Sequence, residues 1–193
     1  MKILEMFDSS GIKVEDPSLR KYINLDAKMI QKGREREKFG RMKINIVERM
    51  INLLCVPGHR GKKHKIMTHQ ATGKFSKNAK VVIEALKIVQ QKTNSNPIQV
   101  LVTALENSAP CDEVTTIEYG GARYPQAVDV SPMRRLNLAL RNIIHGAQDK
   151  AFGKKKKIKV ALAEEIISAS QRSNESLAIS KRNESEKQAD SAR

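Results

Sequence analysis

Apolar residues recur at helical spacing, every three or four positions, in several separate segments of this 193-residue chain. The pattern predicts helices at about residues 42–54, 77–93, 97–108, 132–147 and 158–171. Each segment has an apolar stripe that must be buried, so the pattern favours a helical bundle. The segment at 97–108 is apolar on nearly every side, and we expect it at the centre of the core.

Local signals at the helix ends support these positions. Asn96 before Pro97 and Ser131 before Pro132 combine a capping residue with a proline at the first helical position, where a missing N–H costs nothing. Ser76 is expected to cap the helix at 77–93 in the same way.

The period changes to two between residues 113 and 130, which predicts a β-hairpin that turns at Gly120-Gly121. Pro125 cannot donate a hydrogen bond to a neighbouring strand, so the hairpin is predicted to be an exposed two-stranded ribbon and not the middle of a sheet. A lone hairpin is marginally stable in water, and we expect this one to need a binding partner for full order.

The charge of the chain indicates its partner. Lys and Arg number 36 against 21 Asp and Glu, which gives a net charge of +15 and strong self-repulsion that a polyanion would relieve. No segment has the apolar face of a basic membrane-surface helix, no uninterrupted apolar run reaches membrane-spanning length, and the first residues do not resemble a signal peptide. Cys55 and Cys111 stand alone, as small core residues in a reducing compartment. The sequence predicts a cytoplasmic nucleic-acid-binding protein.

No catalytic constellation can be assembled from the sequence. It contains no glycine-rich phosphate loop, and its four His residues lack the spacing of a helical metal site. Asp112, Glu113 and Glu118 are close in sequence but would not converge on an alternating strand. We therefore expect no enzyme activity, no cofactor and no metal ion.

Three kinds of nucleic-acid binder remain open. The loop from Gly58 to Gly61 has the GxxG form of a KH domain, but its neighbours offer helices without the KH sheet. A helix-turn-helix protein would concentrate its basic residues on one recognition helix. A free-standing RNA chaperone would bind many nucleic acids with similar affinity. Here the basic residues are dispersed over several elements, which favours a large folded RNA that surrounds the protein.

The expected organisation is mainly α: a bundle of five to six helices with a protruding β-hairpin and a basic N-terminal arm. Residues 1–40 are predicted to form the basic extension, and residues 41–182 the RNA-binding helical domain, with the hairpin at 113–130. The chain after Ser173 is polar with almost no apolar stripe, which fits either a frayed helix or a disordered segment, and residues 183–193 are predicted to be a weakly structured tail.

The candidate RNA-binding residues are the cations of the arm, the 59–65 loop, the helices and the lysine run. They are Arg20, Lys21, Arg34, Arg36, Lys38, Arg41, Lys43, Arg60, Lys62, Lys63, His64, Lys65, Lys77, Arg134, Arg135, Arg141, Lys154, Lys155, Lys156 and Lys157. Arg123 and Tyr124 lie just past the hairpin turn, where a cation and a ring can meet a phosphate and a base. The alternative role for Tyr124 is to pair with Tyr119 across the ribbon.

The stretch Tyr119–Ile143, YGGARYPQAVDVSPMRRLNLALRNI, resembles the signature of the small-subunit ribosomal protein seven family, in its archaeal and eukaryotic branch. Further agreement lies in Asn45–Arg49, Gly61–Lys65 and Asn96–Val102, and the arm fits that branch at Asp16–Leu19 and Lys21–Leu25, so the resemblance covers about residues 15–182. It implies a helical bundle with a β-ribbon that binds the 3′ major domain of small-subunit ribosomal RNA directly. It also implies a part in nucleating head assembly, a place beside exit-site transfer RNA and the messenger RNA path, and contacts with neighbouring ribosomal proteins.

Overall fold

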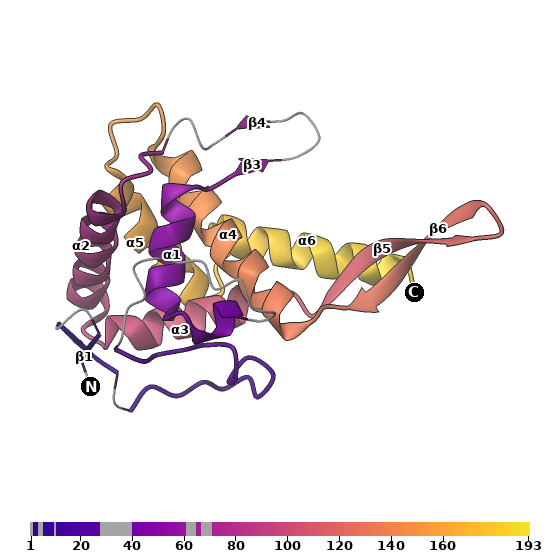
Figure 1. The fold of residues 1–193 in the computed structure, drawn as a ribbon. Helices are drawn as coiled ribbons and strands as arrows, with labels where there is room; N and C mark the ends of the chain where they lie inside the picture. Colours follow the sequence, from indigo (N-terminus) through magenta and orange to yellow (C-terminus); the bar gives the residue numbers. More distant parts are fainter. Residues whose placement is uncertain (1, 4–5, 10, 28–39, 61–64, 67–70) are drawn as a thin grey trace.

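The computed structural model describes residues 2–3, 6–9, 11–27, 40–60, 65–66 and 71–193, and these form a mainly α-helical fold, as predicted (Figure 1). Its helices are the 3-10 helix η1 (Gly40–Lys43) and the α-helices α1 (Ile46–Cys55), α2 (Phe75–Thr93), α3 (Pro97–Ser108), α4 (Pro132–Ala151), α5 (Ile158–Ser170) and α6 (Leu177–Ser191). Its strands are β1 (Lys2–Ile3), β2 (Phe7–Asp8), β3 (His59–Arg60), β4 (Lys65–Ile66), β5 (Asp112–Tyr119) and β6 (Ala122–Asp129), paired as three antiparallel hairpins. None of the described helices is both long and apolar enough to span a membrane.

The core lies where α5 packs against α2, α3 and α4. Leu162 and Ile166 of α5 are fully buried, as are Leu101 and Leu105 of α3. Each such side chain contributes about 1.5–3 kcal/mol on burial. The central position expected for 97–108 is thus shared between α3 and α5, which both lie inside the bundle.

Helix boundaries depart from the predicted ones where side-chain contacts decide them. Asn45 caps α1, its Oδ1 accepting a hydrogen bond from the Val47 N–H at 2.8 Å, so this helix begins after the predicted residue 42. The cap expected at Ser76 is wrong, because α2 already begins at Phe75. The helix predicted at about 132–147 is longer than expected and ends at Ala151.

Part of the predicted N-terminal extension is built into the body of the protein. Phe7, Leu19 and Ile23 are buried in the main core, and the Asp16 N–H donates to the Glu106 carboxylate of α3 at 3.0 Å. Residues 28–39, the centre of the predicted basic arm, lie outside the described residues. The described residues before position 28 therefore form a layer that covers the bundle, and they are not a free extension.

The strands β5 and β6 form the predicted ribbon, which projects from one end of the bundle (Figure 1). The paired residues run from Asp112 opposite Asp129 to Tyr119 opposite Ala122, one residue earlier at each end than the predicted 113–130. Gly120 and Gly121 make the two-residue turn with φ values of 58° and 81°. Positive φ at both turn positions suits the twist of a hairpin and explains the pair of glycines.

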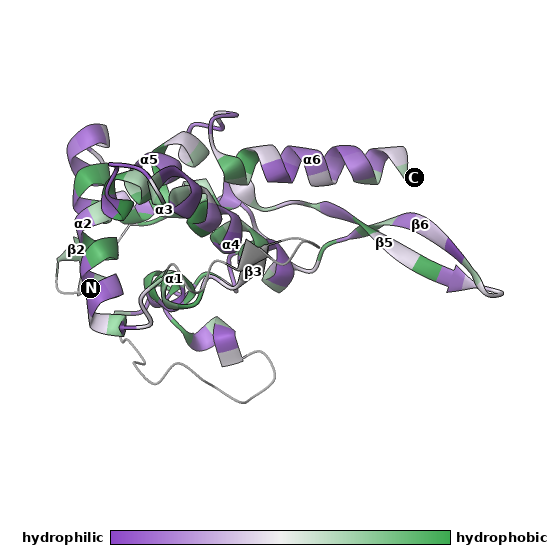
Figure 2. Ribbon diagram, turned by 90° about the horizontal axis from the view of Figure 1, so that it is seen from above, coloured by the Kyte–Doolittle hydropathy of each residue, from purple (hydrophilic) through white to green (hydrophobic). Residues whose placement is uncertain are grey.

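The predicted weak tail at 183–193 is wrong, because these residues form most of helix α6. The helix is largely hydrophilic (Figure 2), with Ala178, Ile179 and Ala189 as its buried residues. Its second half is held by polar contacts to the base of β5, which an apolar stripe does not reveal. The boundary placed at residue 182 therefore falls inside one continuous helix.

Candidate nucleic-acid interface

The exposed side of α4 carries two of the predicted contact residues. Arg134 and Arg141 are both exposed, and Asn137 lies between them on the helix. A residue seven positions further along a helix returns to nearly the same face, so the two guanidinium groups share one side. No described residue forms an ion pair with Arg141. This side of α4 begins directly after the ribbon returns to the bundle.

Arg134 is already partnered within the chain. Its Nε donates to Glu113 Oε2 of β5 at 2.7 Å, and Nη2 donates to the other carboxylate oxygen. This hydrogen bonding raises the pKa of Arg134. Because its side chain remains 56% exposed, the pair is worth little to stability, and the outer guanidinium edge stays accessible to an anion.

Arg135, predicted as a contact residue beside Arg134, lies on the opposite, buried side of the helix. Its Nη2 lies 2.9 Å from Asp16 Oδ2, and Nε donates to the carbonyl oxygen of Pro110 at 3.1 Å. The same guanidinium also donates to Ser18 Oγ. With these partners Arg135 joins the N-terminal layer to the base of the ribbon, and it is no longer a candidate for a phosphate contact.

Arg49 of α1 was missed by the sequence analysis. It is 5% exposed and donates to Asn137 Oδ1 at 2.8 Å and to the Tyr22 carbonyl oxygen at 3.2 Å, but no carboxylate among the described residues pairs with it. Burial lowers the pKa of Arg49 to about 10, and the nearby charge of Arg41 adds to the effect. A phosphate held between Arg41 and Arg49 would offset both the lost hydration and the mutual repulsion.

Arg41, Arg49 and the exposed side of α4 form one surface, which we call the α1–α4 face. It contains two shallow depressions of about 340 and 280 Å³ that share Asn137 in their lining. Arg41 and Arg49 line the first, and Arg134 and Arg141 line the second. The face therefore brings together four guanidinium groups from η1, α1 and α4 around one amide.

The other predicted cations are dispersed. Arg20 and Lys21 are exposed beside buried Leu19, Lys43 is exposed in η1, and Lys77 is exposed in the first turn of α2. Lys154, Lys155 and Lys157 are exposed between α4 and α5, while Lys156 forms an ion pair with Glu164.

Other predicted cations belong to the arm and to the 59–65 loop. Arg34, Arg36 and Lys38 of the arm, and Lys62, Lys63 and His64 of the loop, lie outside the described residues. Arg60 and Lys65 belong to β3 and β4, whose backbones pair antiparallel.

The ribbon presents aromatic rings on one face. Tyr119 is opposite Ala122 and Tyr124 is opposite Ile117, so the direct Tyr119–Tyr124 pairing considered above does not form. The two rings share a face because side chains alternate along each strand, and they are 83% and 58% exposed. Arg123 lies on the other face and pairs with Glu118 at 3.3 Å. Exposed rings of this kind can stack on bases.

The described residues contain no group of His, Cys, Asp and Glu side chains that could hold a metal ion. Cys55 is buried as expected, but Cys111 is exposed. The fold and its surface define a class of basic, mainly helical proteins with a projecting β-ribbon, whose separate cationic surfaces suit a polyanion of complex shape.

Comparison with known proteins makes this assignment specific. Residues 19–193 match the family model described as ribosomal protein S7p/S5e. The chain is 47% identical to the small ribosomal subunit protein uS7 of Nanoarchaeum equitans, across 100% of this chain and 99% of that protein. It is 44% identical to the uS7 protein of Picrophilus torridus over 99% of this chain and 98% of that one, and 42% identical to the protein of the same name from Methanococcus maripaludis over 100% and 99%. The chain belongs to the ribosomal protein S7p/S5e family.

Proposed function

We propose that this protein is a structural constituent of the small ribosomal subunit. It binds the 3′ major domain of small-subunit ribosomal RNA directly, nucleates assembly of the head, and catalyses no reaction. It acts in the cytoplasm beside other small-subunit proteins, with its ribbon next to exit-site transfer RNA and the messenger RNA path. Full-length similarity to small ribosomal subunit proteins supports the general role.

The observation that carries direct RNA binding is the α1–α4 face. Arg41 and Arg49 lie together with no carboxylate partner among the described residues, although Arg49 is almost fully buried. A buried cation without a counter-charge costs several kcal/mol in an isolated chain. A phosphate at this surface would supply the missing charge, and its hydrogen bonds to guanidinium groups are among the stronger ones in proteins.

The distribution of the remaining cations supports a large RNA over a short duplex. The α1–α4 face and the lysine run are associated with opposite ends of α4, a helix of 20 residues that is therefore about 30 Å long. Contacts so far apart require a ligand that extends around the protein. We assign Arg123 and Tyr124 to the ribbon contact with transfer RNA or messenger RNA, because both are exposed at the end furthest from the core.

The proposal is tested by binding and by sedimentation. The protein should bind a transcript of the 3′ major domain more tightly than transcripts of the other small-subunit RNA domains at the same salt concentration, and it should sediment with small subunits at moderate salt. Equal affinity for all transcripts, with no association with subunits, would instead support a free nucleic-acid-binding protein or RNA chaperone. Replacing Arg49 by Met, which keeps the apolar stem, should weaken binding. Lys92→Met, which removes an exposed cation of α2 outside the candidate set, is the control.

A further inference from the structure

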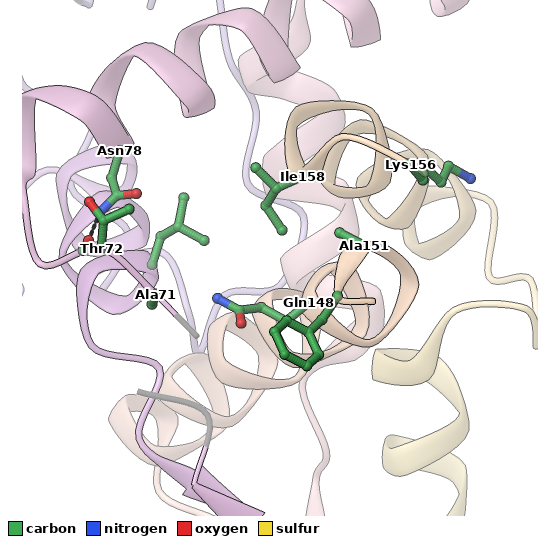
Figure 3. A pocket seen from close by; sticks show the side chains of 9 residues that line it. Ala71, Thr72, Asn78, Gln148, Ala151, Lys156 and Ile158 are labelled. Carbon is green, nitrogen blue, oxygen red and sulfur yellow. Dashed lines mark hydrogen bonds between the residues drawn. The ribbon is translucent and has the colours of Figure 1, made fainter. Parts of the chain in front are cut away.

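A separate pocket of about 220 Å³ lies at the other end of α4 from Arg134 (Figure 3). Its walls come from α1, α2, the end of α4 and the start of α5, with Leu54 and Ile158 as apolar lining. Pockets that hold whole drug-sized ligands begin at about 300 Å³. The space is therefore suited to a single ring system.

Gln148 provides the polar group of this pocket. The residue is only 5% exposed overall, and its side chain lines the pocket. Figure 3 shows the amide directed between the lining side chains, toward the side on which Ala71 lies. An amide both donates and accepts hydrogen bonds, so this group favours an occupant that can do the same.

A second amide is fixed nearby. The Asn78 nitrogen donates to the Thr72 carbonyl oxygen at 2.5 Å and to Cys55 Sγ at 3.0 Å. These bonds hold the amide in one orientation and leave its oxygen as an acceptor. An apolar side chain in the pocket would cover the Gln148 amide without offering it a hydrogen bond, whereas the edge of a nucleobase offers donors and acceptors.

The rim of the pocket adds an aromatic ring and positive charge. Phe152, directly after α4, lines the pocket and is 56% exposed, so its ring is accessible to an occupant. Lys154 and Lys155 follow it, both exposed and without an ion pair among the described residues. An exposed ring beside free cations is the arrangement by which proteins stack an unpaired base and hold its phosphates.

We propose that this pocket holds one unpaired base of the bound RNA. The base stacks on Phe152, the Gln148 amide hydrogen-bonds its edge, and Lys154 and Lys155 hold the flanking phosphates. The inference rests on the proposed RNA-binding function and adds a base-specific contact to it.

The test measures affinity for a transcript of the 3′ major domain of small-subunit ribosomal RNA over a range of salt concentrations. Phe152→Ala should weaken binding about 5- to 150-fold, which corresponds to about 1–3 kcal/mol per stacked base, without changing the slope of log K against log salt. Phe152→Tyr should restore binding, because its ring can stack. Lys154→Ala should instead lower the slope by roughly one unit. Met6→Ala, which removes another exposed apolar side chain, is the matched control and should have no effect.

Chemical probing of the bases provides a second measurement. The wild-type protein should shield one unpaired base that becomes reactive in the Phe152→Ala complex, while the other protections remain. Ala151→Leu fills the pocket but keeps the ring, and it should expose the same base. An unchanged melting temperature for each variant would show that the fold is intact.

Several results would overturn the inference. Unchanged affinity and protection in Phe152→Ala would show that no base binds in the pocket. A changed salt slope would show that Phe152 supports a phosphate contact instead. If RNA binding were intact but the variant were lost from assembled subunits, the occupant would be a side chain of a neighbouring protein. Failure of the wild-type protein to bind the transcript would overturn the proposed function as well, whereas binding by the wild type with no effect of Phe152→Ala would overturn this inference alone.

Discussion

Replacing Gly146 by Ala should destabilise the protein, although helix propensity predicts the opposite. Gly146 lies in the interior of α4, where Ala is usually favoured over Gly by about 1 kcal/mol. A Cβ at this position would lie 2.6 Å from Glu165 Oε1 and 3.0 Å from Leu177 Cβ. The glycine thus allows α4 to approach α5 and α6 closely.

The magnitude depends on how firmly Glu165 is held. Its side chain is fully buried, with Oε2 2.6 Å from Lys150 Nζ, and Oε1 accepts a hydrogen bond from Ser176 Oγ at 2.7 Å. Moving the carboxylate away from a new methyl group would weaken both contacts. Breaking a buried ion pair completely costs about 3–5 kcal/mol. After allowing for partial relaxation and the gain in helix propensity, we expect a net loss of about 2–4 kcal/mol.

Urea denaturation followed by circular dichroism would measure this loss, and a fall in melting temperature of roughly 5–15 °C should accompany it. A double-mutant cycle with Glu165→Ala is the control, since Gly146→Ala should cost much less once the carboxylate is gone. If Gly146→Ala is as stable as the wild type, the close approach of the helices is not limiting and the reasoning is wrong.

Four further results are expected. Deleting residues 183–193 should cost about 1–3 kcal/mol in urea denaturation and speed hydrogen exchange in β5, because α6 holds the ribbon base; a loss below about 0.5 kcal/mol would count against this role. Burial raises the pKa of Asp16, but hydrogen bonds from Ser18 and the charge of Arg135 outweigh it, so the pKa lies below its usual 3.8. Asp16→Asn should therefore cost about 1–3 kcal/mol at pH 7, and its difference from the wild type should shrink as the pH falls below about 4 and the wild-type carboxylate is protonated. Arg141→Ala should lower the salt slope of RNA binding by roughly one unit with unchanged stability. Removing residues 120–124 should leave folding and entry into subunits intact but reduce retention of exit-site transfer RNA; normal retention would remove the ribbon from this contact.

Local signals in the sequence were sufficient for several elements. The predicted helix 97–108 is confirmed at both ends, because Asn96 and Pro97 fix its start and Ala109-Pro110 ends it. The ribbon followed from a change of period and from two glycines at the turn. In these places the neighbouring residues alone determine the backbone.

The roles of individual charged residues could not be predicted from neighbouring residues in the same way. Arg134 and Arg135 are adjacent and identical in type, yet one is exposed and the other is buried among Asp16, Ser18 and Pro110. The partners of Arg135 are far away in sequence, so composition cannot distinguish the two. The sequence does contain one signal, since Arg135 is four positions before buried Ala139 and shares its face of the helix.

The sequence left helix α6 undecided between a frayed helix and a disordered tail for a related reason. Its polar contacts with the ribbon, such as Ser185 Oγ donating to the Asp112 carbonyl oxygen at 3.1 Å, join residues 73 positions apart. Arg49 was missed because counting charges does not separate a buried guanidinium from exposed ones. The stretch Asn45–Arg49, which resembles the family, was the available signal.

The contact between Ser18 and Arg135 has a consequence for how the chain folds. The two residues are 117 positions apart, and the second lies beyond the ribbon. During synthesis, Ser18 cannot contact Arg135 until α4 has left the ribosome exit tunnel, and closing so long a loop is slow compared with forming local helices. The link from Ser18 to α4 is therefore made late in translation, and it joins one of the first segments synthesised to one of the later ones.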